Sequence, residues 1–458
     1  MDSGLARDYR VIPVGQGDGT LRCCSDLSES ELWEELEILL GKSVEVEQVD
    51  TDQMEWMLSK YYRKQEGRSA ISVSVRNPET FLDDLIGEAK GLNSSDIHIE
   101  SYEKKCRVRF RIDGHLMEKY AIPKNDYPAL INKIKIKSNL DIAEKRLPQD
   151  GRIEYDNHGV KFDIRVSVLP TLYGEKVVMR LLNNDATNID LDTLGMRDLE
   201  KDYYREAIRK PSGIVLISGP TGSGKTTTLY ATLKLLNKEN LNVVTVEDPI
   251  EYTLPGINQV QVKESIGLSF ASALRSFLRQ DPDVIMLGEI RDAETANMAI
   301  RAALTGHLVL STVHTNSAWG TISRLRDMGV PAFLLSGTLN ASIAQRLVRK
   351  LCPHCKREEA FDLKKFPLAY KPPRILQHIH QPVGCIHCHH SGYQGRLALY
   401  EIIPVYRELV ESIKNNENNI SDYLLKWKIK SLSDNAFDAL ESGITSLDEV
   451  YPYLTHNH

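Results

Sequence analysis

The chain has 458 residues, and a prior of about 150 residues per domain predicts about three domains. Its 41% hydrophobic and 26% charged residues exclude a disordered or fibrous protein. No apolar run reaches the ~18 residues of a membrane span, no signal peptide is recognisable, and the net charge of −6 gives no chain-wide attraction to nucleic acid or anionic lipid. Seven cysteines are too few for a disulfide scaffold, so we expect reduced thiols in an intracellular protein.

The first 68 residues predict a small acidic αβ domain. Residues 11–14 fit a short strand, and apolar residues then recur at helical spacings from Ser28 to Leu40, with Gly41 as a natural stop. A second helix is expected over residues 52–62. The leucine and tryptophan stripe of the first helix is either part of the internal core or a face on which a partner docks.

Residues 69–185 predict an α+β domain with an antiparallel sheet. A helix is expected from Pro78 to Gly91 and another between residues 127 and 140. Residues 106–112 alternate between apolar side chains and arginines, which is typical of a strand with one buried face, and Asp113-Gly114 follows as a hairpin signal. Further strands are expected within 153–155, 162–168 and 177–181. Residues 186–205 are expected to form a linker.

The arginines of this strand, at positions 107, 109 and 111, raise the possibility of nucleic-acid binding. One basic strand face in a mildly acidic protein is weak evidence, and no recognition module accompanies it. We therefore expect an exposed face or a subunit contact and predict no nucleic-acid partner.

Residues 206–458 predict an α/β domain. Nearly continuous apolar strands alternate with helical segments, a pattern typical of a sheet that is buried on both faces. The expected strands are 214–217, 243–246, 284–287 and 308–310. Within this domain, residues 350–392 form a cysteine-containing subdomain, and 400–458 form a helical carboxyl-terminal region.

The segment GPTGSGKTT, starting at Gly219, is the strongest motif in the chain. It matches the G-x4-G-K-[ST] phosphate loop and lies between an apolar strand and a helical segment. Its glycines let successive backbone N–H groups face one anion, and the helix that follows directs its positive end at the same point. The expected nucleotide-binding residues are Gly219, Pro220, Thr221, Gly222, Ser223, Gly224, Lys225, Thr226 and Thr227.

Carboxylates follow two of the apolar strands, as ATP hydrolysis requires. Glu289 comes after strand 284–287, and the acidic turn Glu247-Asp248-Pro249-Ile250-Glu251 comes after strand 243–246. Carboxylates at strand ends also cap helices, but two of them downstream of a phosphate loop favour an active site. His307 and His314 flank the next strand, and either is structural or senses the nucleotide.

Cys352, Cys355, Cys385 and Cys388 form two C-x2-C pairs, which together can hold one tetrahedral Zn²⁺. Four filled ligand positions leave none open for catalysis, so a structural role is predicted. Unliganded thiols or a redox pair are the alternatives, and a neighbouring histidine could replace one thiolate. Cys23, Cys24 and Cys106 have no partner pattern and are expected to be buried thiols.

These motifs resemble the secretion ATPase superfamily, which powers type II secretion and type IV pilus assembly. The resemblance covers residues 78–401 and rests on GPTGSGKTTT (219–228), VEDPIEY (246–252), DPDVIMLGEIRD (281–292), the histidine box (306–315), SSDIHIE (94–100), VRFRIDG (108–114), RLPQDGRI (146–153) and DIRVS (163–167). It implies a RecA-like P-loop ATPase core preceded by a PAS-like α+β domain, and the cysteine quartet is similar to that of the type II secretion and pilus-extension branches.

The resemblance also implies roles for single residues. Lys225 and Thr226 hold the phosphates and Mg²⁺, and Glu289 supports the Mg²⁺. Glu251 polarises the attacking water, and His314 senses the γ-phosphate. Arginines are expected to complete the site at boundaries between subunits of a hexamer; the candidates are Arg152, Arg165, Arg275, Arg279, Arg291 and Arg324.

The resemblance therefore predicts a cytoplasmic hexameric ATPase that uses ATP, Mg²⁺ and Zn²⁺. It would act at the inner membrane, attached only through the cytoplasmic domain of an anchoring protein of the secretion platform, with residues 1–68 as the docking domain. Type II secretion is favoured over pilus extension because the amino-terminal region is short. A nucleic-acid translocase and a module that binds nucleotide without turnover are the alternatives from other classes.

Overall fold

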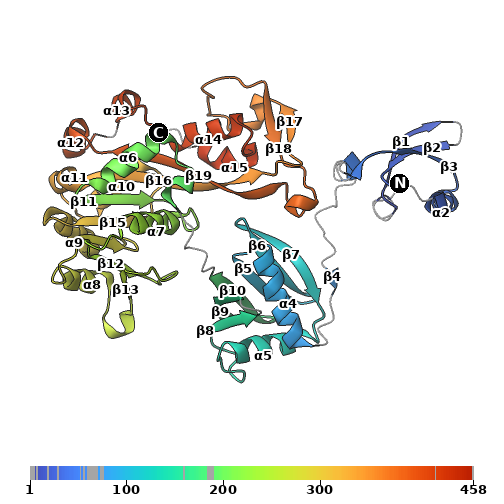
Figure 1. The fold of residues 1–458 in the computed structure, drawn as a ribbon, viewed down its shortest axis with the longest axis horizontal. Helices are drawn as coiled ribbons and strands as arrows, with labels where there is room; N and C mark the ends of the chain where they lie inside the picture. The colour runs from blue at the N-terminus through green and yellow to red at the C-terminus, as the bar shows by residue number, and fades with distance from the viewer. Residues whose placement is uncertain are drawn as a thin grey trace.

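The computed structural model describes residues 6, 9–17, 20–27, 30–51, 53–54, 57–58, 71–72, 77–157, 160–182, 190–417 and 419–455. The strands in these ranges form a three-stranded sheet, two seven-stranded sheets and a two-stranded sheet (Figure 1). We call the three larger sheets the first, second and third sheet in chain order.

The first sheet has the order β1-β2-β3 and is accompanied by helix α2. Its elements are β1 (Val11–Gly17), β2 (Thr20–Ser25), α2 (Ser30–Leu40) and β3 (Ser43–Gln48). Gly41, at φ +62°, ends α2 as predicted. Leu36 of α2 is fully buried against Val11 and Cys23, and Trp33 and Leu40 pack against the same cluster, whereas Leu39 is half exposed. The apolar stripe therefore contributes to the core. Ser28 and most of the helix expected over 52–62 lie outside the described residues.

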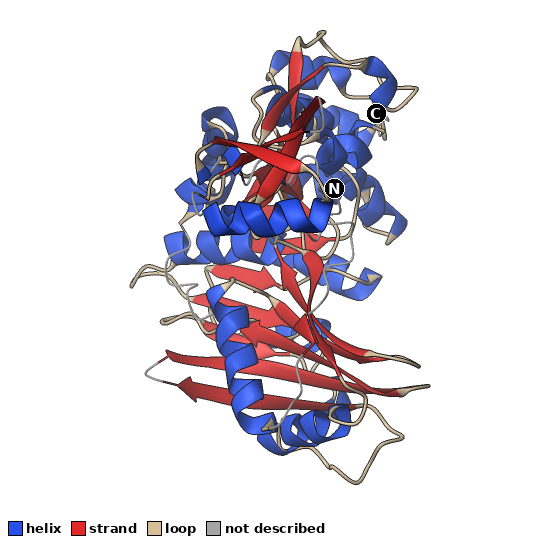
Figure 2. Cartoon of the chain, turned by 90° about the vertical axis from the view of Figure 1, so that its right-hand side faces the viewer, coloured by secondary structure: helices blue, strands red, loops and turns tan. Residues whose placement is uncertain are grey.

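The second sheet has the order β4-β7-β6-β5-β10-β9-β8. Its elements are β4 (Ile71–Ser72), α4 (Pro78–Gly91), β5 (Asp96–Ser101), β6 (Cys106–Ile112), β7 (His115–Ile122), α5 (Tyr127–Lys137), β8 (Gln149–Asn157), β9 (Val160–Thr171) and β10 (Gly174–Leu182). Apolar side chains of α4 and α5 join the alternating buried residues of the strands in one core. Figure 2 shows a helix lying across the strands of this sheet. The predicted turn is present, with Asp113 and Gly114 both at positive φ.

The arginines of β6 form ion pairs on the second sheet. Glu100 of β5 is 3% exposed and accepts hydrogen bonds from Arg107 at 2.9 Å and from Arg109 at 2.7 Å. Arg111 lies 3.3 Å from Asp96. Burial alone would raise the pKa of Glu100, but the hydrogen bonds from the two arginines outweigh it and lower the pKa to about 2. These arginines therefore neutralise carboxylates of the same sheet.

The third sheet has the order β13-β12-β14-β15-β11-β16-β19, with parallel pairing throughout except between β16 and β19. Its strands are β11 (Gly213–Ser218), β12 (Val243–Glu247), β13 (Asn258–Gln261), β14 (Val284–Leu287), β15 (Leu308–Val313), β16 (Leu339–Leu351) and β19 (Tyr393–Pro404). Ile214 and Leu216 of β11 pack into one core, and Val215 and Ile217 pack into another. Since successive residues of a strand face opposite sides, the sheet is buried on both faces, as predicted.

Helices accompany the third sheet along its whole length (Figure 1). They are α6 (Asp198–Arg209), α7 (Lys225–Leu236), α8 (Phe270–Phe277), α9 (Ala293–Leu304), α10 (Ala318–Asp327), α11 (Ala332–Thr338), α12 (Arg407–Lys414), α13 (Ser421–Lys426), α14 (Leu432–Glu441) and α15 (Leu447–Leu454). Short 3₁₀ turns occur at Leu191–Thr193, Glu264–Ile266, Leu363–Lys365 and Ile386–Cys388, and β17 (Arg357–Ala360) pairs with β18 (His378–Gln381).

Part of the segment that we expect to be a linker is helical. Residues 198–205 belong to α6, and Tyr203 and Tyr204 lie in the core beneath the third sheet. Their burial with Ala207 and Ile208 gives α6 an apolar face, which is why this charged stretch is ordered.

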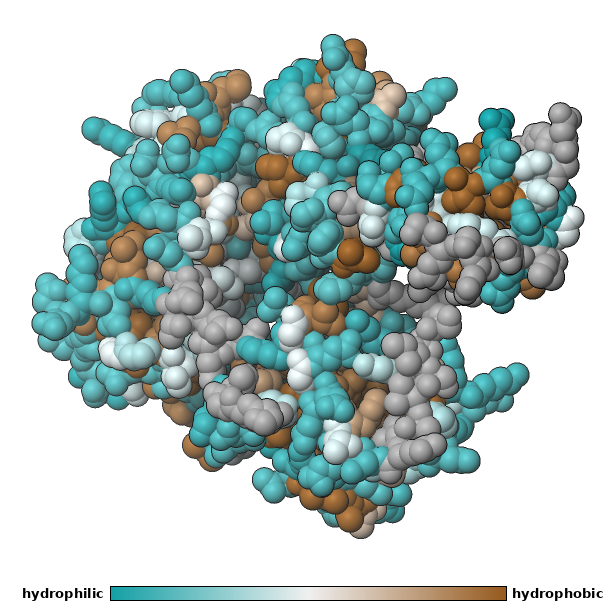
Figure 3. Space-filling model, turned by 45° about the vertical axis from the view of Figure 1, so that its right-hand side comes forward, coloured by the Kyte–Doolittle hydropathy of each residue, from teal (hydrophilic) through white to brown (hydrophobic). Residues whose placement is uncertain are grey.

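No helix among the described ranges combines the length and the apolar character that crossing a bilayer requires. On the face drawn in Figure 3, apolar side chains are scattered among hydrophilic ones.

Candidate active site

The phosphate loop connects β11, in the interior of the third sheet, to the first turn of α7. Gly219, Gly222 and Gly224 all have positive φ. A Cβ on Gly219 would lie 2.5 Å from the backbone carbonyl oxygen of Gln345, and one on Gly224, which has φ +86°, would lie 2.8 Å from the side-chain Nε2 of the same residue. The curl of the loop against β16 therefore requires glycine at both positions.

Lys225, the first residue of α7, folds back onto the loop. Its side chain is largely buried, and Nζ donates hydrogen bonds to the carbonyl oxygens of Gly219 at 2.8 Å and Pro220 at 3.0 Å. Burial lowers the pKa of Lys225, while the charge of Glu289 acts in the opposite direction. The ammonium group is thus held at the loop, where an anion would meet it.

The other loop residues differ in exposure. Thr221 and Thr226 are exposed, Thr227 is intermediate, and Ser223 is buried. The Ser223 hydroxyl has no hydrogen-bond partner within the described residues. A buried hydroxyl without a partner is unfavourable, so the loop offers an unused donor and acceptor.

Glu289 follows β14 and lies close to residues from two neighbouring elements. Its carboxylate is 3.5 Å from Nε2 of His314, which follows β15, and it accepts a hydrogen bond from Arg291. That hydrogen bond raises the pKa of Arg291, and Arg291 also lies 3.7 Å from Asp248 of the acidic turn. The structure thus brings the predicted carboxylate and histidine together at one edge of the third sheet.

Glu251, the last carboxylate of the acidic turn, is in contact with the second sheet. Arg165 of β9 donates to its carboxylate at 3.3 Å and also donates to the carbonyl oxygen of Ile250. Arg152 is the cross-strand partner of Arg165, but its exposed side chain pairs with Asp163 on the same sheet. Of these two predicted arginines, one reaches the acidic turn in this conformation.

The remaining candidates lie elsewhere in the described part of the chain. Arg275 pairs with Glu294 at 2.6 Å, and Arg279 donates to the carbonyl oxygen of Arg275. Arg324 is exposed on α10. His307 contacts the hydroxyl of Thr305 and the carbonyl oxygen of Ala302, which is a local loop arrangement. None of these contacts involves a predicted catalytic residue.

Arg346 of β16 is a site residue that sequence reasoning missed. It is 6% exposed and donates to the carbonyl oxygens of Gln345 at 2.9 Å and Asn316 at 2.7 Å. Burial lowers its pKa, and its charge in turn lowers the pKa of Lys225. The available signal is the adjacent polar pair Gln345-Arg346, which lies between the apolar residues Ala344 and Leu347 in the middle of β16.

The four predicted cysteines form a buried cluster. Their sulfur atoms all lie within 4.8 Å of one another, and Sγ···Sγ distances of 3.8 Å join Cys352 to Cys385 and Cys388 to both Cys355 and Cys385. These separations are far longer than the ~2.05 Å of a disulfide bond. Tetrahedral Zn–S bonds of ~2.3 Å place sulfur atoms about 3.8 Å apart, so the cluster has the dimensions of a zinc site.

Backbone N–H groups surround the cluster. Gly384 donates to the sulfur of Cys355, and Cys385 and Gly392 donate to that of Cys388, each at 3.2 Å. Such donors favour the thiolate form that binds a metal. The nearby rings of His354 and His387 stack on each other, and the metal-ligand group found within the described residues consists of the cysteines alone.

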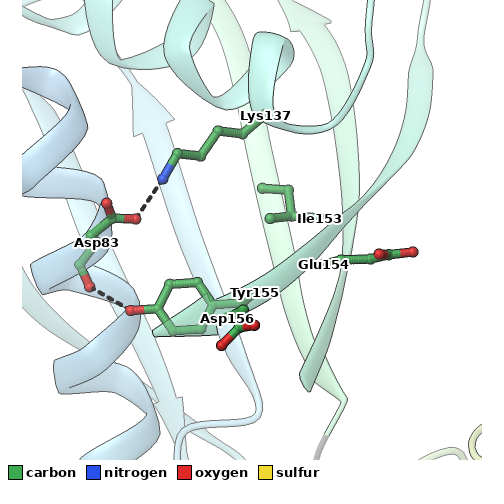
Figure 4. A pocket seen from close by; sticks show the side chains of 6 residues that line it. All are labelled: Asp83, Lys137, Ile153, Glu154, Tyr155 and Asp156. Atoms are coloured by element: carbon green, nitrogen blue, oxygen red, sulfur yellow. Dashed lines mark hydrogen bonds and ion pairs between the residues drawn. The ribbon is translucent and has the colours of Figure 1, made fainter. Parts of the chain in front are cut away.

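A separate pocket of about 250 Å³ lies on the second sheet between α4, α5 and β8 (Figure 4). Lys137 is paired with Asp83 at 2.6 Å, and the hydroxyl of Tyr155 donates to the backbone carbonyl of Asp83. The other lining residues are Ile153, Glu154 and Asp156. None of the predicted site residues lines this pocket.

Comparison with protein families places most of the chain in one of them. The model of a type II/IV secretion system protein matches residues 74–452. The chain is 44% identical over 447 residues to the putative type II secretion system protein E of Escherichia coli K12, covering 96% of this chain and 90% of the relative. It is 48% identical over 370 residues to the type II secretion system ATPase E of Vibrio cholerae, covering 80% and 73%.

Relatives from pilus systems match over similar lengths. The type IV pilus assembly ATPase PilB of Myxococcus xanthus is 42% identical over 477 residues, covering 97% of this chain and 84% of the relative. Among solved structures, the pilus retraction motor PilT with bound ADP is similar with a TM-score of 0.55 and 27% identity, covering 81% and 95%. The Legionella pneumophila ATPase DotB has a TM-score of 0.61 at 23% identity, covering 84% and 99%, which shows a shared fold.

Proposed function

Because the chain belongs to the family of type II/IV secretion system proteins and is a secretion or pilus-assembly ATPase, we propose that it hydrolyses ATP to drive pseudopilus assembly and protein export by a type II secretion system. The supporting observation is the convergence of Lys225 from the start of α7, Glu289 from the loop after β14 and His314 from the loop after β15. A phosphate loop alone binds nucleotide, whereas a carboxylate and a histidine beside it provide groups for hydrolysis.

The chain's own residues have distinct roles in this proposal. Lys225 exchanges its bonds to the loop carbonyls for phosphate oxygens, and the exposed Thr226 together with Glu289 holds Mg²⁺. Bound Mg²⁺ neutralises charge on the phosphates. Glu251 orients and polarises the attacking water, and His314 detects the γ-phosphate through its contact with Glu289.

We further propose that six copies form a ring in which arginines of the second sheet complete the site of a neighbouring subunit. An arginine supplied in trans neutralises phosphoryl charge only when subunits close, which couples hydrolysis to movement. Residues 1–68, 69–185 and 206–458 act as the docking, intermediate and ATPase domains. The docking domain holds the ring at the cytoplasmic face of the inner membrane through an anchoring protein.

The cysteine cluster is proposed to hold a structural zinc ion. Cys352, Cys355, Cys385 and Cys388 supply all four ligands, and their spacing fits a tetrahedral site. A closed site of this kind stabilises a small lobe that has little apolar core of its own.

Phosphate release by the purified full chain tests the enzymatic part. We expect turnover in the wild type and its loss in Lys225→Ala and Glu251→Gln. Equal turnover in all three proteins contradicts the site, and a rise in turnover on adding DNA or RNA would favour a translocase. Replacing the chromosomal copy with Lys225→Ala tests the biological role: loss of exported proteins with pili intact supports type II secretion, whereas loss of pili supports the related pilus-extension function.

A further inference from the structure

Glu247, the last residue of β12, is a buried carboxylate that no predicted role uses. It is 3% exposed and accepts hydrogen bonds from three side chains. These are the hydroxyl of Thr245 at 2.6 Å, the amide of Gln259 at 3.1 Å and the hydroxyl of Tyr230. A buried carboxylate needs such partners, so their arrangement around Glu247 is strongly constrained.

Tyr230 connects this carboxylate to the acidic turn. Its hydroxyl oxygen, while donating to Glu247, accepts a hydrogen bond from the backbone N–H of Glu251 at 3.3 Å. Burial raises the pKa of Tyr230, and the charge of Glu247 raises it further, so the hydroxyl remains a proton donor. A chain of two hydrogen bonds, which we call the relay, therefore runs from the backbone N–H of Glu251 through the Tyr230 hydroxyl to the Glu247 carboxylate.

Tyr230 also lies on the phosphate-loop helix. It is five residues after Lys225 in α7, and both side chains are buried. A helix is a stiff element, so the position of Lys225 and that of the Tyr230 hydroxyl change together. Gln259 holds the segment that follows Glu251. Its side-chain oxygen accepts a hydrogen bond from the backbone N–H of Leu254 at 2.6 Å, and its side-chain nitrogen donates to the carbonyl oxygen of Tyr252 at 3.2 Å.

We propose that Tyr230 is a positioning residue for ATP hydrolysis: with Glu247 it fixes the backbone of Glu251 relative to the phosphate loop. This inference rests on the proposed function, in which Glu251 acts on the attacking water. A carboxylate that is misplaced by a fraction of a bond length acts poorly on water although the nucleotide still binds.

Tyr252 provides a matched control. Its ring packs edge-on against that of Tyr230, with centroids 4.4 Å apart, and its buried hydroxyl has no hydrogen-bond partner within the described part of the chain. Tyr230→Phe and Tyr252→Phe therefore remove the same atom from two rings in the same cluster. Only the first change breaks the relay to Glu251.

The experiment measures steady-state ATP hydrolysis, ATP affinity and thermal unfolding of the full chain in both variants and in Glu251→Gln. We expect Tyr230→Phe to lower kcat by about 10-fold or more with KM and the unfolding midpoint near the wild-type values. Tyr252→Phe should keep wild-type kcat. Amide hydrogen exchange at Glu251 should accelerate in Tyr230→Phe only, because the Glu251 N–H then loses its acceptor. This measurement tests the relay independently of ATP hydrolysis.

The outcomes separate this inference from the function on which it rests. If Tyr230→Phe has wild-type kcat and unchanged amide hydrogen exchange at Glu251, the inference about Tyr230 is overturned. If Glu251→Gln is inactive in the same experiment, the proposed ATPase function still stands. Equal losses of kcat in both tyrosine variants indicate a packing effect and also overturn it. If Glu251→Gln keeps full turnover, the assigned role of Glu251 is wrong. If Tyr230→Phe does not fold, Glu247→Gln takes its place, because it replaces the charged acceptor of the Tyr230 hydroxyl by a weaker neutral one. It should show the same slower turnover with unchanged KM, and wild-type turnover in this variant overturns the inference.

Discussion

Arg165 of the second sheet donates a hydrogen bond to the carboxylate of Glu251 at 3.3 Å, although the two residues are 86 positions apart and Glu251 lies in the turn that follows β12 of the third sheet. Both side chains are about one-third exposed, at 32% and 38%. Ion pairs of this exposure contribute about 1 kcal/mol or less to stability. The contact therefore positions the Glu251 carboxylate but adds little to stability. Its removal should lower the rate of ATP hydrolysis more than the free energy of unfolding.

Arg165→Ala is the first prediction. We expect kcat for ATP hydrolysis to fall by at least about 10-fold, because Arg165 holds the carboxylate of Glu251, which is proposed to act on the attacking water. The free energy of unfolding should change by no more than about 1 kcal/mol. Arg152→Ala, at the paired position on β8, is the comparison. If Arg152→Ala abolishes turnover and Arg165→Ala does not, the two roles are reversed.

Glu289→Gln should nearly abolish turnover while nucleotide still binds. The change keeps the shape of the side chain but removes the charge beside Lys225 and His314, and a loss of about 100-fold or more in kcat is expected. Glu294→Gln is the control, since Glu294 is an exposed carboxylate paired with Arg275 on neighbouring helices. Similar kinetics in the two variants would contradict the assignment of Glu289.

Metal analysis tests the cysteine cluster. We expect the purified chain to carry zinc in a one-to-one ratio and to lose it in Cys388→Ser, with a lower unfolding midpoint, because one ligand of a closed site is gone. Cys106→Ser changes a buried cysteine outside the cluster and should retain the metal. Zinc-free wild-type protein with an unchanged unfolding midpoint after chelation would exclude a structural zinc ion.

Glu100 predicts a pH dependence of stability. Its pKa is about 2 in the folded protein against 4.5 ordinarily, so its contribution is complete above pH 4.5 and is lost as the pH falls through 2. Glu100→Gln should therefore lower the unfolding free energy at pH 7 by on the order of 3 kcal/mol. Denaturant unfolding at pH 7, 4 and 2.5 measures this, and a difference that does not shrink with decreasing pH contradicts the explanation.

Local signals in the sequence predicted much of the secondary structure. Helix α4 has the predicted bounds because a capping Asn77 and a proline at its start define one end of a strongly periodic segment. The turn at Asp113-Gly114 follows from residues that tolerate positive φ. The close packing of the four cysteines was predictable because each C-x2-C pair already brings two sulfurs together.

Long-range relationships in the candidate site could not be predicted. Nothing local distinguishes Glu247 from Glu251, although the first is buried among hydrogen bonds and the second faces Arg165. The side chain of Arg346 reaches the phosphate loop only because β16 pairs with β11. Helix α6 likewise packs against strands of the third sheet, all of which follow it in the chain.

The pairing of β16 with β19 links the phosphate loop to the cysteine cluster through one continuous ribbon (Figure 1). Gln345 contacts the phosphate loop, and Cys352, the residue after the end of β16, lies seven residues further along the chain, about 23 Å away for extended chain. The cysteine cluster therefore begins just beyond the carboxyl end of a strand whose middle lies against the phosphate loop. A tilt of β16 on nucleotide binding would therefore also move the cysteine cluster.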